Sequence, residues 1–156
     1  MKKFIIILTL GMLMMIWSCG SDSGNGGQQS SSAQKTQETG GLSQWELEHG
    51  IGPIKSALQL GPVDKALAEE GAKAFEIKCT ACHRLDERYV GPPLRNVTQK
   101  RTPEYIMNMI LNPDEMVKSH PEARKMLAEY LAPMTNQNLK PEEARAILEY
   151  FRSEEK

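Results

Sequence analysis

The pentapeptide Cys79-Thr80-Ala81-Cys82-His83 constrains this 156-residue chain more than any other feature of its sequence. The chain has only three cysteines, and the third, Cys19, lies far away near the N-terminus. A framework of several disulfides therefore cannot form, although a domain of this size buries only a modest core and needs some further source of stability. The two sulfurs and the imidazole must serve a metal, a redox reaction or the attachment of a larger group.

The first 18 residues predict a signal peptide. Lys2 and Lys3 precede an uncharged apolar run over residues 4–17, which is too short to favour a permanent transmembrane helix. The run ends at Ser18-Cys19, which resembles the lipobox of bacterial lipoproteins and implies an acylated Cys19. The alternative is an ordinary cleaved signal followed by a chance cysteine. We therefore expect an exported protein, lipid-anchored to a membrane and facing the periplasm or the cell exterior.

Three segments follow the predicted signal peptide. Residues 19–41 comprise the lipidated cysteine and a tether of mainly Gly, Ser, Gln and Thr, which is too polar to order itself. Residues 42–62 form a less polar N-terminal extension, which we expect to pack across the outside of the folded domain; the alternative is an arm that docks a partner. Residues 63–156 form that domain. The whole chain is nearly charge-balanced, with a net charge of -1 at pH 7, so nucleic acid is not an expected partner.

The folded part predicts an all-α domain, since none of it has the pattern of a convincing strand. Each predicted helix begins at a capping residue or at a proline in its first turn and carries apolar residues at helical spacing. Ser119 and Glu122 have the spacing of a capping box. The predicted helices run from Asp64 to Cys79, from Thr102 to Asn112, from Ser119 to Tyr130 and from Pro141 to Phe151.

Three chemistries compete for the pentapeptide. A structural zinc site needs a second pair of ligands at similar spacing, and the chain has none. A thioredoxin-type dithiol needs a strand-helix-strand context, whereas the surroundings here are helical. Covalent haem uses both sulfurs as thioethers and the adjacent histidine as an iron ligand. The pattern therefore favours one covalently bound haem c, held by Cys79 and Cys82, with His83 on the iron.

The sequence around this motif resembles the class I monohaem cytochromes c. Gly71 and Phe75 stand at the spacings where that family keeps a glycine and an aromatic on its first helix, and residues 146–153, with Tyr150, resemble its last helix. The resemblance implies the class I cytochrome c fold, with short helices around one haem. It also implies that the carbonyl of Pro92 accepts a hydrogen bond from His83 and raises its basicity as a ligand.

The same resemblance implies a sixth iron ligand, for which the methionines compete. Met134 follows Pro133 in the loop before the last helix and resembles the axial methionine of the family. The methionines of the predicted helices are more typical of core or surface positions. His49 and His120 are expected to be solvated surface histidines.

Together these features imply an electron-transfer protein rather than an enzyme. Residues 85–94, 107–113 and 133–139 resemble the small lipoprotein cytochromes c of bacterial nitrous oxide reductase systems. That resemblance implies a protein that donates single electrons to a periplasmic reductase. It would receive these electrons from an upstream quinol-oxidising complex. The alternatives are donation to a cytochrome c oxidase, a haem sensor or enzyme with a labile sixth ligand, and a structural zinc protein.

Basic residues cluster after the motif and allow two interpretations. They form either a basic rim that steers acidic redox partners or a solvated loop. The residues concerned are Arg84, Arg88, Arg95, Lys100 and Arg101.

Overall fold

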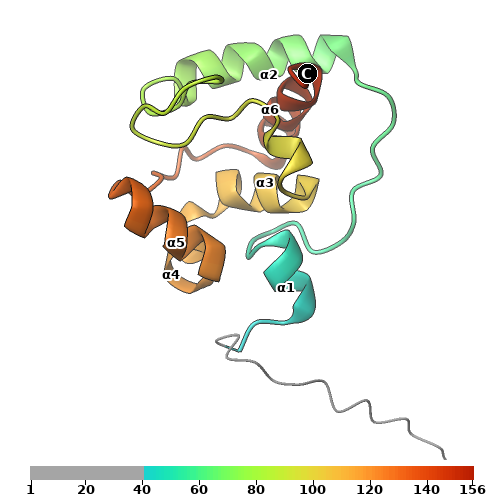
Figure 1. Ribbon diagram of the computed structural model, residues 1–156. Coiled ribbons are helices and arrows are strands. Elements are labelled where there is room, and N and C mark those ends of the chain that lie inside the picture. Colours follow the sequence, from blue (N-terminus) through green and yellow to red (C-terminus); the bar gives the residue numbers. More distant parts are fainter. Residues whose placement is uncertain (1–40) are drawn as a thin grey trace, which may run out of the picture. The chain divides into compact units, whose positions relative to one another are not determined.

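The computed structural model describes residues 41–156 (Figure 1). The described part contains helices and no strand, so the predicted all-α class is confirmed. The predicted signal peptide, Cys19 and nearly all of the predicted tether lie outside the described residues. The elements are α1 (Gln44–His49), α2 (Lys65–Lys78), the 3-10 turn η1 (Val97–Gln99), α3 (Pro103–Leu111), α4 (Pro113–Ser119), α5 (Pro121–Tyr130) and α6 (Pro141–Ser153). None of the described helices combines the length and apolarity needed to span a bilayer.

The two helices α2 and α6 cross at close range and form the centre of the core. Gly71 of α2 lies so near the backbone of α6 that a Cβ atom there would collide with the carbonyl oxygen of Ala146. The absence of a side chain at Gly71 is therefore what allows the crossing. One turn further along α2, the buried ring of Phe75 lies 5.5 Å from the ring of Tyr150 and 5.6 Å from that of Phe151.

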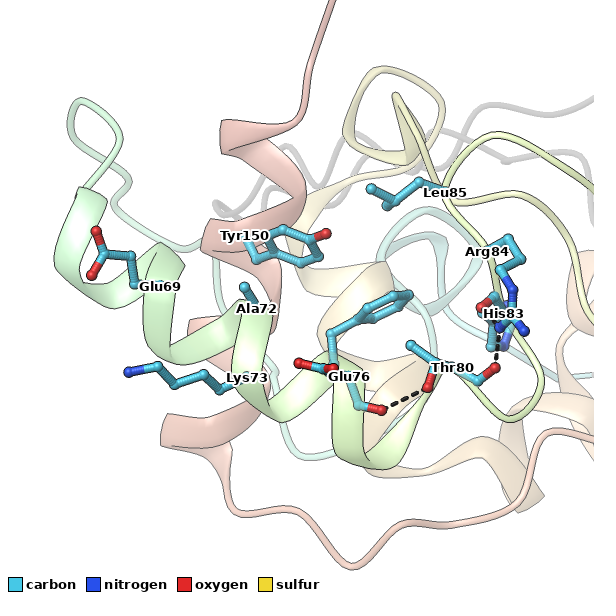
Figure 2. Close-up of a pocket in the computed structure, with 10 residues that line it drawn as sticks. Glu69, Ala72, Lys73, Glu76, Thr80, His83, Arg84, Leu85 and Tyr150 are labelled. Carbon is cyan, nitrogen blue, oxygen red and sulfur yellow. Dashed lines mark hydrogen bonds between the residues drawn. The ribbon is translucent and has the colours of Figure 1, made fainter.

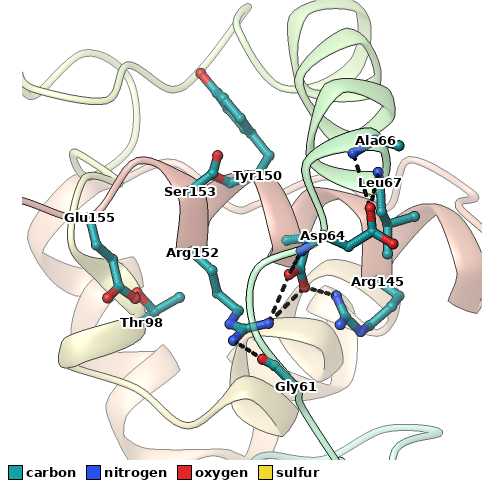
Figure 3. Close-up of polar contacts among 11 residues, drawn as sticks. Gly61, Asp64, Ala66, Leu67, Thr98, Arg145, Tyr150, Arg152, Ser153 and Glu155 are labelled. Atoms are coloured by element: carbon teal, nitrogen blue, oxygen red, sulfur yellow. Dashed lines mark hydrogen bonds and ion pairs between the residues drawn. The ribbon is translucent and has the colours of Figure 1, made fainter.

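A buried carboxylate on α6 holds the start of α2 in place (Figure 3). Glu149 is fully buried between Arg145 and Arg152, and it accepts a hydrogen bond of 2.8 Å from the backbone N–H of Asp64. The side chain of Asp64 in turn accepts from the first free N–H groups of α2 at 3.0 and 3.1 Å. Burial acts to raise the pKa of Glu149. The hydrogen bonds that Glu149 accepts from the backbone of Asp64 and from Arg145 and Arg152 outweigh this effect and lower the pKa. The carboxylate therefore links α6 to the chain that enters α2.

Helix α4 was not predicted from the sequence. Asn112 ends α3 as expected, but the following Pro113 also starts the short helix α4, because proline is well suited to the first helical position. The predicted capping box at Ser119 and Glu122 is wrong, since Ser119 is the last residue of α4. His120 caps α5 instead, and its Nδ1 accepts from the N–H of Glu122 at 3.2 Å.

The expectation that His120 and His49 are solvated surface residues is also wrong. His120 is only 1% exposed, and its Nε2 lies 3.2 Å from the carbonyl oxygen of Leu47. Burial lowers the pKa of His120 and favours the neutral ring. His49 stacks on Trp45 and brings its Nδ1 within 3.0 Å of the carboxylate of Glu104. Both imidazoles therefore take part in holding the N-terminal extension.

Residues 42–62, which we call the strap, pack against α3. Asn108 is fully buried, and its side-chain oxygen accepts from the N–H of Ile54 at 2.9 Å. Its amide group donates to the carbonyl oxygens of His49 at 2.9 Å and Ile54 at 3.0 Å. Glu104 accepts from the N–H of Leu58 at 2.6 Å. Helix α3 therefore supplies, through polar side chains, the hydrogen bonds that the irregular strap cannot make with itself.

Candidate cofactor site

A cavity of about 550 Å³ lies between α3, α5, the segment after α2 and the segment before α6. Its volume is within the roughly 300–1,000 Å³ typical of pockets for organic ligands. Cys79, Cys82 and His83 line it from the segment after α2, and Met134 lines it from the segment before α6. The structure thus brings all four candidate cofactor-binding side chains to one cavity.

The pentapeptide forms a tight turn at the C-terminal end of α2. The N–H groups of Cys82 and His83 both donate to the carbonyl oxygen of Cys79, at 3.0 and 2.9 Å. Cys79 is half-buried and Cys82 is exposed, and both are free thiols. Burial, together with the neighbouring Cys82, raises the pKa of the Cys79 thiol to about 11. A dithiol oxidoreductase needs a lowered thiol pKa, so this environment argues against that chemistry.

The imidazole of His83 is oriented by the backbone that follows it. Its Nδ1 lies 3.1 Å from the carbonyl oxygen of Pro92, which is the hydrogen bond that the family resemblance implies. Burial lowers the pKa of His83, although the Pro92 carbonyl acts in the opposite direction. The neutral ring donates from Nδ1 to Pro92 and keeps the lone pair of Nε2 for a metal.

Gly91 is required for this arrangement. A Cβ atom at Gly91 would lie 2.5 Å from Cε1 of His83, so any larger residue would displace the ring. The N–H of Gly91 also donates to the carbonyl oxygen of Cys82 at 2.8 Å, which closes the loop back onto the motif. The sequence placed Gly91 in a turn that resembles the Gly-Pro-x-Leu turn of the family but gave it no role of its own, whereas Pro92 was expected to fix the histidine.

Three methionines line the cavity, not one. Met134 is partly buried and packs against the hydrophobic core around α2 and α6. Met109 of α3 and Met126 of α5 also reach the cavity. The sequence assigned both to core or surface, since a helical methionine carries no signal that distinguishes a packing side chain from one that borders a cofactor.

The rest of the lining fits a large apolar cofactor. Helix α5 turns its predicted apolar stripe to the cavity, yet Met126, Leu127 and Tyr130 on that stripe are only partly buried by protein. With its two thiols, its neutral imidazole, its thioethers and an apolar lining, the cavity has the donor set and the surface that haem c requires. The other apolar lining residues include Leu94, Val97, Ile106, Ile110, Ile147 and Phe151.

A second hollow, of about 700 Å³, borders the same histidine from the side of α2 (Figure 2). It is lined by charged and polar side chains such as Lys73 and Glu76, together with Phe75 and Tyr150. Its lining includes neither cysteine of the motif and no methionine. The cavity lined by Cys79, Cys82 and Met134 is therefore the candidate haem site.

Three of the five basic residues after the motif, namely Arg88, Arg95 and Arg101, lie within ion-pair distance of carboxylates of the protein. Arg95 pairs with Asp86 and Glu154, and Arg101 pairs with Glu122 at 3.0 Å. These contacts favour the second of the two interpretations of the basic cluster, because paired guanidinium groups form a weak basic rim.

Comparison with known proteins agrees with this site. The family model for cytochrome c matches residues 68–155. A cytochrome c from Rhodothermus marinus has 50% sequence identity to the chain and a TM-score of 0.66, with 69% of this chain and 93% of that chain covered. An engineered form of that cytochrome, bound to a carbene intermediate (1-ethoxy-1-oxopropan-2-ylidene), has 50% identity and a TM-score of 0.63, with 69% and 94% covered. The search of curated proteins returned no match.

The family model covers more than half of the chain, and the structural matches extend over nearly the whole of the Rhodothermus protein. The described fold is the class I cytochrome c fold. Such proteins carry covalently bound haem c and exchange electrons with redox partner proteins. The chain belongs to the cytochrome c family.

Proposed function

We propose that the protein is an exported, lipid-anchored carrier of single electrons, in which His83 and Met134 are the two axial ligands of the haem iron and Cys79 and Cys82 hold the haem. Haem c, when bound, supplies an iron that cycles between Fe(III) and Fe(II). A thioether as the sixth ligand raises the reduction potential and keeps the iron coordinately saturated, which suits a carrier rather than an enzyme or sensor.

The observation that carries the proposal is that His83 and Met134 line the same cavity, although the first lies before α3 in the sequence and the second lies after α5. His83 is fixed by the Pro92 carbonyl at 3.1 Å. Met134 follows Pro133, which limits the backbone freedom of the segment that presents the thioether. Both ligands are therefore held by the protein.

The direct test is Met134→Ala, compared with Met109→Leu and Met126→Leu. All three methionines line the cavity, so the controls remove a thioether without removing the proposed ligand. We expect Met134→Ala to retain covalent haem, to lower the reduction potential and to let carbon monoxide bind the reduced iron. The two controls should keep the wild-type potential and exclude carbon monoxide.

An unchanged potential in Met134→Ala would refute the ligand assignment. A gain of carbon monoxide binding in one control instead would transfer the assignment to that methionine. Carbon monoxide binding by the wild-type protein would favour a haem sensor or enzyme with a labile sixth ligand.

The membrane anchor is proposed from the sequence of residues 1–41. Acylation of Cys19 would leave residues 20–41 as a flexible tether, with the strap over residues 42–62 and the cytochrome domain over residues 63–156 beyond it. Replacing Cys19 by Ser should abolish labelling with radioactive palmitate and move the protein from the membrane fraction to the soluble periplasmic fraction. Labelling that persists in Cys19→Ser would contradict the anchor.

We further propose a terminal reductase, namely nitrous oxide reductase, as the electron acceptor, with a quinol-oxidising complex as the donor. The support is the resemblance over residues 85–94, 107–113 and 133–139. A cytochrome c oxidase is the competing acceptor. Stopped-flow oxidation of the reduced protein by each purified acceptor separates the two, since the physiological acceptor should react at least tenfold faster.

A further inference from the structure

The segment that orients His83 has no regular structure of its own. Residues 84–95, which we call the His83 loop, lie between α2 and η1 and contain neither helix nor strand. This loop supplies the carbonyl oxygen of Pro92, which lies 3.1 Å from Nδ1 of His83. Because no helix or sheet holds that oxygen in place, its position depends on what fixes the loop.

Backbone hydrogen bonds join the two ends of the His83 loop. The N–H groups of residues 94 and 95 donate to the carbonyl oxygens of residues 84 and 85, at 3.1 and 2.8 Å. The two residues before this pairing, Pro92 and Pro93, are prolines, whose rings restrict the backbone angle φ. A shift of Arg95 therefore also shifts the Pro92 carbonyl, which lies only three positions earlier in this stiff segment.

The side chain of Arg95 attaches the closed end of the His83 loop to the end of α6. Its guanidinium donates to both carboxylate oxygens of Asp86, which belongs to the loop, and one of these hydrogen bonds measures 2.9 Å. The same group donates to the backbone carbonyl oxygen of Glu154 at 2.9 Å and to the carboxylate of Glu154 at 2.7 Å. Glu154 directly follows α6. Arg95 therefore bridges three points of the chain: its own position, the start of the loop and the end of α6.

Helix α6 is a rigid support for this bridge, because its buried side chains belong to the core that it forms with α2. Two further contacts hold the chain next to the loop against the C-terminal end. The N–H of Lys156 donates to the side chain of Asn96 at 3.0 Å, and the hydroxyl of Thr98 donates to the carboxylate of Glu155 (Figure 3). Both contacts involve residues after the loop, whereas Arg95 also reaches back into it through Asp86.

The Arg95 bridge is better suited to fixing positions than to stabilising the fold. The side chain of Asp86 is 64% exposed, and ion pairs with exposed groups contribute little to stability. The side chain of Arg95, in contrast, is only 17% exposed. A planar guanidinium that binds both oxygens of a carboxylate fixes the relative orientation of the two segments that it joins.

We propose that Arg95 is a positioning residue for His83: by joining the His83 loop to α6, it holds the Pro92 carbonyl against Nδ1 and so sets the strength of that hydrogen bond. The inference rests on the proposed role of His83 as an iron ligand and adds how the protein tunes this ligand. The hydrogen bond makes the imidazole a more basic ligand, which favours Fe(III) over Fe(II). The Arg95 bridge therefore lowers the reduction potential of the haem-loaded protein.

The test is Arg95→Lys in the haem-loaded protein. Lysine keeps the positive charge, so the charge near the haem is unchanged, but a single ammonium group cannot reproduce the planar fork. Arg152→Lys is the matched control. Arg152 is similarly covered, at 18% exposed, and it also joins a carboxylate, that of Glu149, to a carbonyl oxygen, that of Gly61. These partners lie outside the His83 loop, so the control loses a comparable bridge of α6 without loosening the loop.

Two measurements report on the histidine rather than on the fold. In NMR spectra of the reduced protein, we expect the Nδ1 proton of His83 to exchange with water about tenfold faster in Arg95→Lys, because local opening of the loop becomes easier. In a redox titration, the ratio of Fe(II) to Fe(III) at a fixed applied potential should rise about threefold, because the imidazole becomes a less basic ligand. Arg152→Lys should keep the wild-type values of both, although its unfolding temperature falls.

Wild-type proton exchange and potential in Arg95→Lys would overturn the proposal and leave Arg95 a purely structural residue. Equal changes in Arg95→Lys and Arg152→Lys would also overturn it, because they would reflect general loosening of α6. If Arg95→Lys does not fold, Asp86→Glu decides the question. This change keeps the charge at an exposed position but shifts the carboxylate, and it should alter both quantities in the same direction by a smaller factor; no change would overturn the proposal.

The role of His83 as an iron ligand is tested separately in the wild type. The ring protons of an imidazole bound to the iron of the reduced protein resonate far upfield, because the haem ring shifts them. Their absence in the wild type would refute the ligand assignment, whatever the Arg95 variant shows. Their presence, with unchanged exchange and potential in Arg95→Lys, would refute the positioning role alone.

Discussion

On one face of α3, Glu104 and Asn108 are hydrogen-bonded to the strap, whereas on the opposite face Ile106, Met109 and Ile110 line the cofactor cavity. The strap side is polar, and the buried side chains of Glu104 and Asn108 find partners within the strap. The cavity side is apolar and requires the haem to complete its packing. The same helix is therefore stabilised by specific hydrogen bonds on one face and by a cofactor on the other.

The difference in energy between the two faces is large. Covering the apolar side chains that line the cavity with haem should stabilise the fold by about 1.5–3 kcal/mol for each large side chain that becomes fully buried. Several such side chains together approach the whole free energy of unfolding of a typical domain, about 5–15 kcal/mol. Hydrogen bonds such as those to the strap contribute about 1 kcal/mol each. Haem attachment should therefore decide whether the domain folds, and the strap should adjust how stable it is.

The largest expected effect comes from preventing haem attachment with Cys79→Ser and Cys82→Ser together. We expect the double variant to lose covalent haem and most of its helical structure, because the apolar lining of the cavity has no other partner. Haem staining of a denaturing gel and far-UV circular dichroism measure the two losses. Ala81→Ser, an exposed position within the same motif, is the control and should keep both. A helical, cooperative and haem-free double variant would contradict the comparison.

The cavity side of the fold was largely predictable from the sequence, and the strap side was not. Local patterns with fixed spacing correctly indicated the helices and the cofactor. These patterns are the pentapeptide, Gly71 and the apolar stripes of α2, α3, α5 and α6. Hydrogen bonds between distant segments leave no such pattern. Nothing near Asn108 in the sequence indicates that its partners are His49 and Ile54, more than fifty positions earlier.

The histidines show the same limit. His49 lies before the predicted domain and His120 lies at a predicted helix start, which is typical of solvated side chains. In the fold, His49 contacts Glu104, and His120 lies against Leu47 and the ring of Tyr105. Helix α4 was missed because Pro113 has two roles that the sequence does not separate: it ends α3 and begins the next helix. The sequence left two interpretations of the basic cluster open, because charge alone does not show pairing, and the carboxylates of Glu154 and Glu122 that pair with Arg95 and Arg101 come from other elements.

The next largest effect should come from Asn108→Ala on the strap side. The change leaves the N–H of Ile54 and two carbonyl oxygens of the strap without their partners, so we expect a loss of about 3 kcal/mol in the free energy of unfolding. Asn112→Ala removes a single hydrogen bond, to Ile51, and should cost about 1 kcal/mol. Denaturant unfolding of the haem-loaded proteins measures both. Similar losses for the two variants would show that Asn108 is not the main attachment of the strap.

The pH dependence of the strap follows from Glu104. Burial raises the pKa of this carboxyl group, but the hydrogen bonds from Leu58 and His49 outweigh it, so the pKa lies below its ordinary value. The ionised carboxylate therefore stabilises the fold above that ordinary value, and its contribution is lost as the pH falls through the lowered pKa. Glu104→Gln should cost about 2 kcal/mol at pH 7, since hydrogen bonds to a charged acceptor are among the stronger ones.

The test compares wild type and Glu104→Gln in denaturant at pH 7, 5 and 3. The difference in unfolding free energy should be constant between pH 7 and 5 and should narrow towards pH 3. Glu76→Gln, at an exposed position of α2, is the control and should track the wild type. A difference that widens in acid would mean that the neutral form of Glu104, not its carboxylate, binds the strap.

The smallest expected effect concerns Tyr105, which lies on α3 between the two faces. Its ring lines the cavity and packs edge-on against His120 at 5.1 Å, while its hydroxyl is buried and has no hydrogen-bond partner among the described residues. Because a buried hydroxyl without a partner is destabilising, Tyr105→Phe should leave the unfolding free energy of the haem-loaded protein unchanged or raise it by up to about 1 kcal/mol. Tyr89→Phe, which removes the hydroxyl group of an exposed tyrosine, is the control and should leave the unfolding free energy unchanged. If Tyr105→Phe alone lowers the unfolding free energy by more than about 1 kcal/mol, the hydroxyl group has a partner on the cofactor side. Tyr105 would then belong to the cofactor-dependent face of α3 and would not mark the division between the two faces.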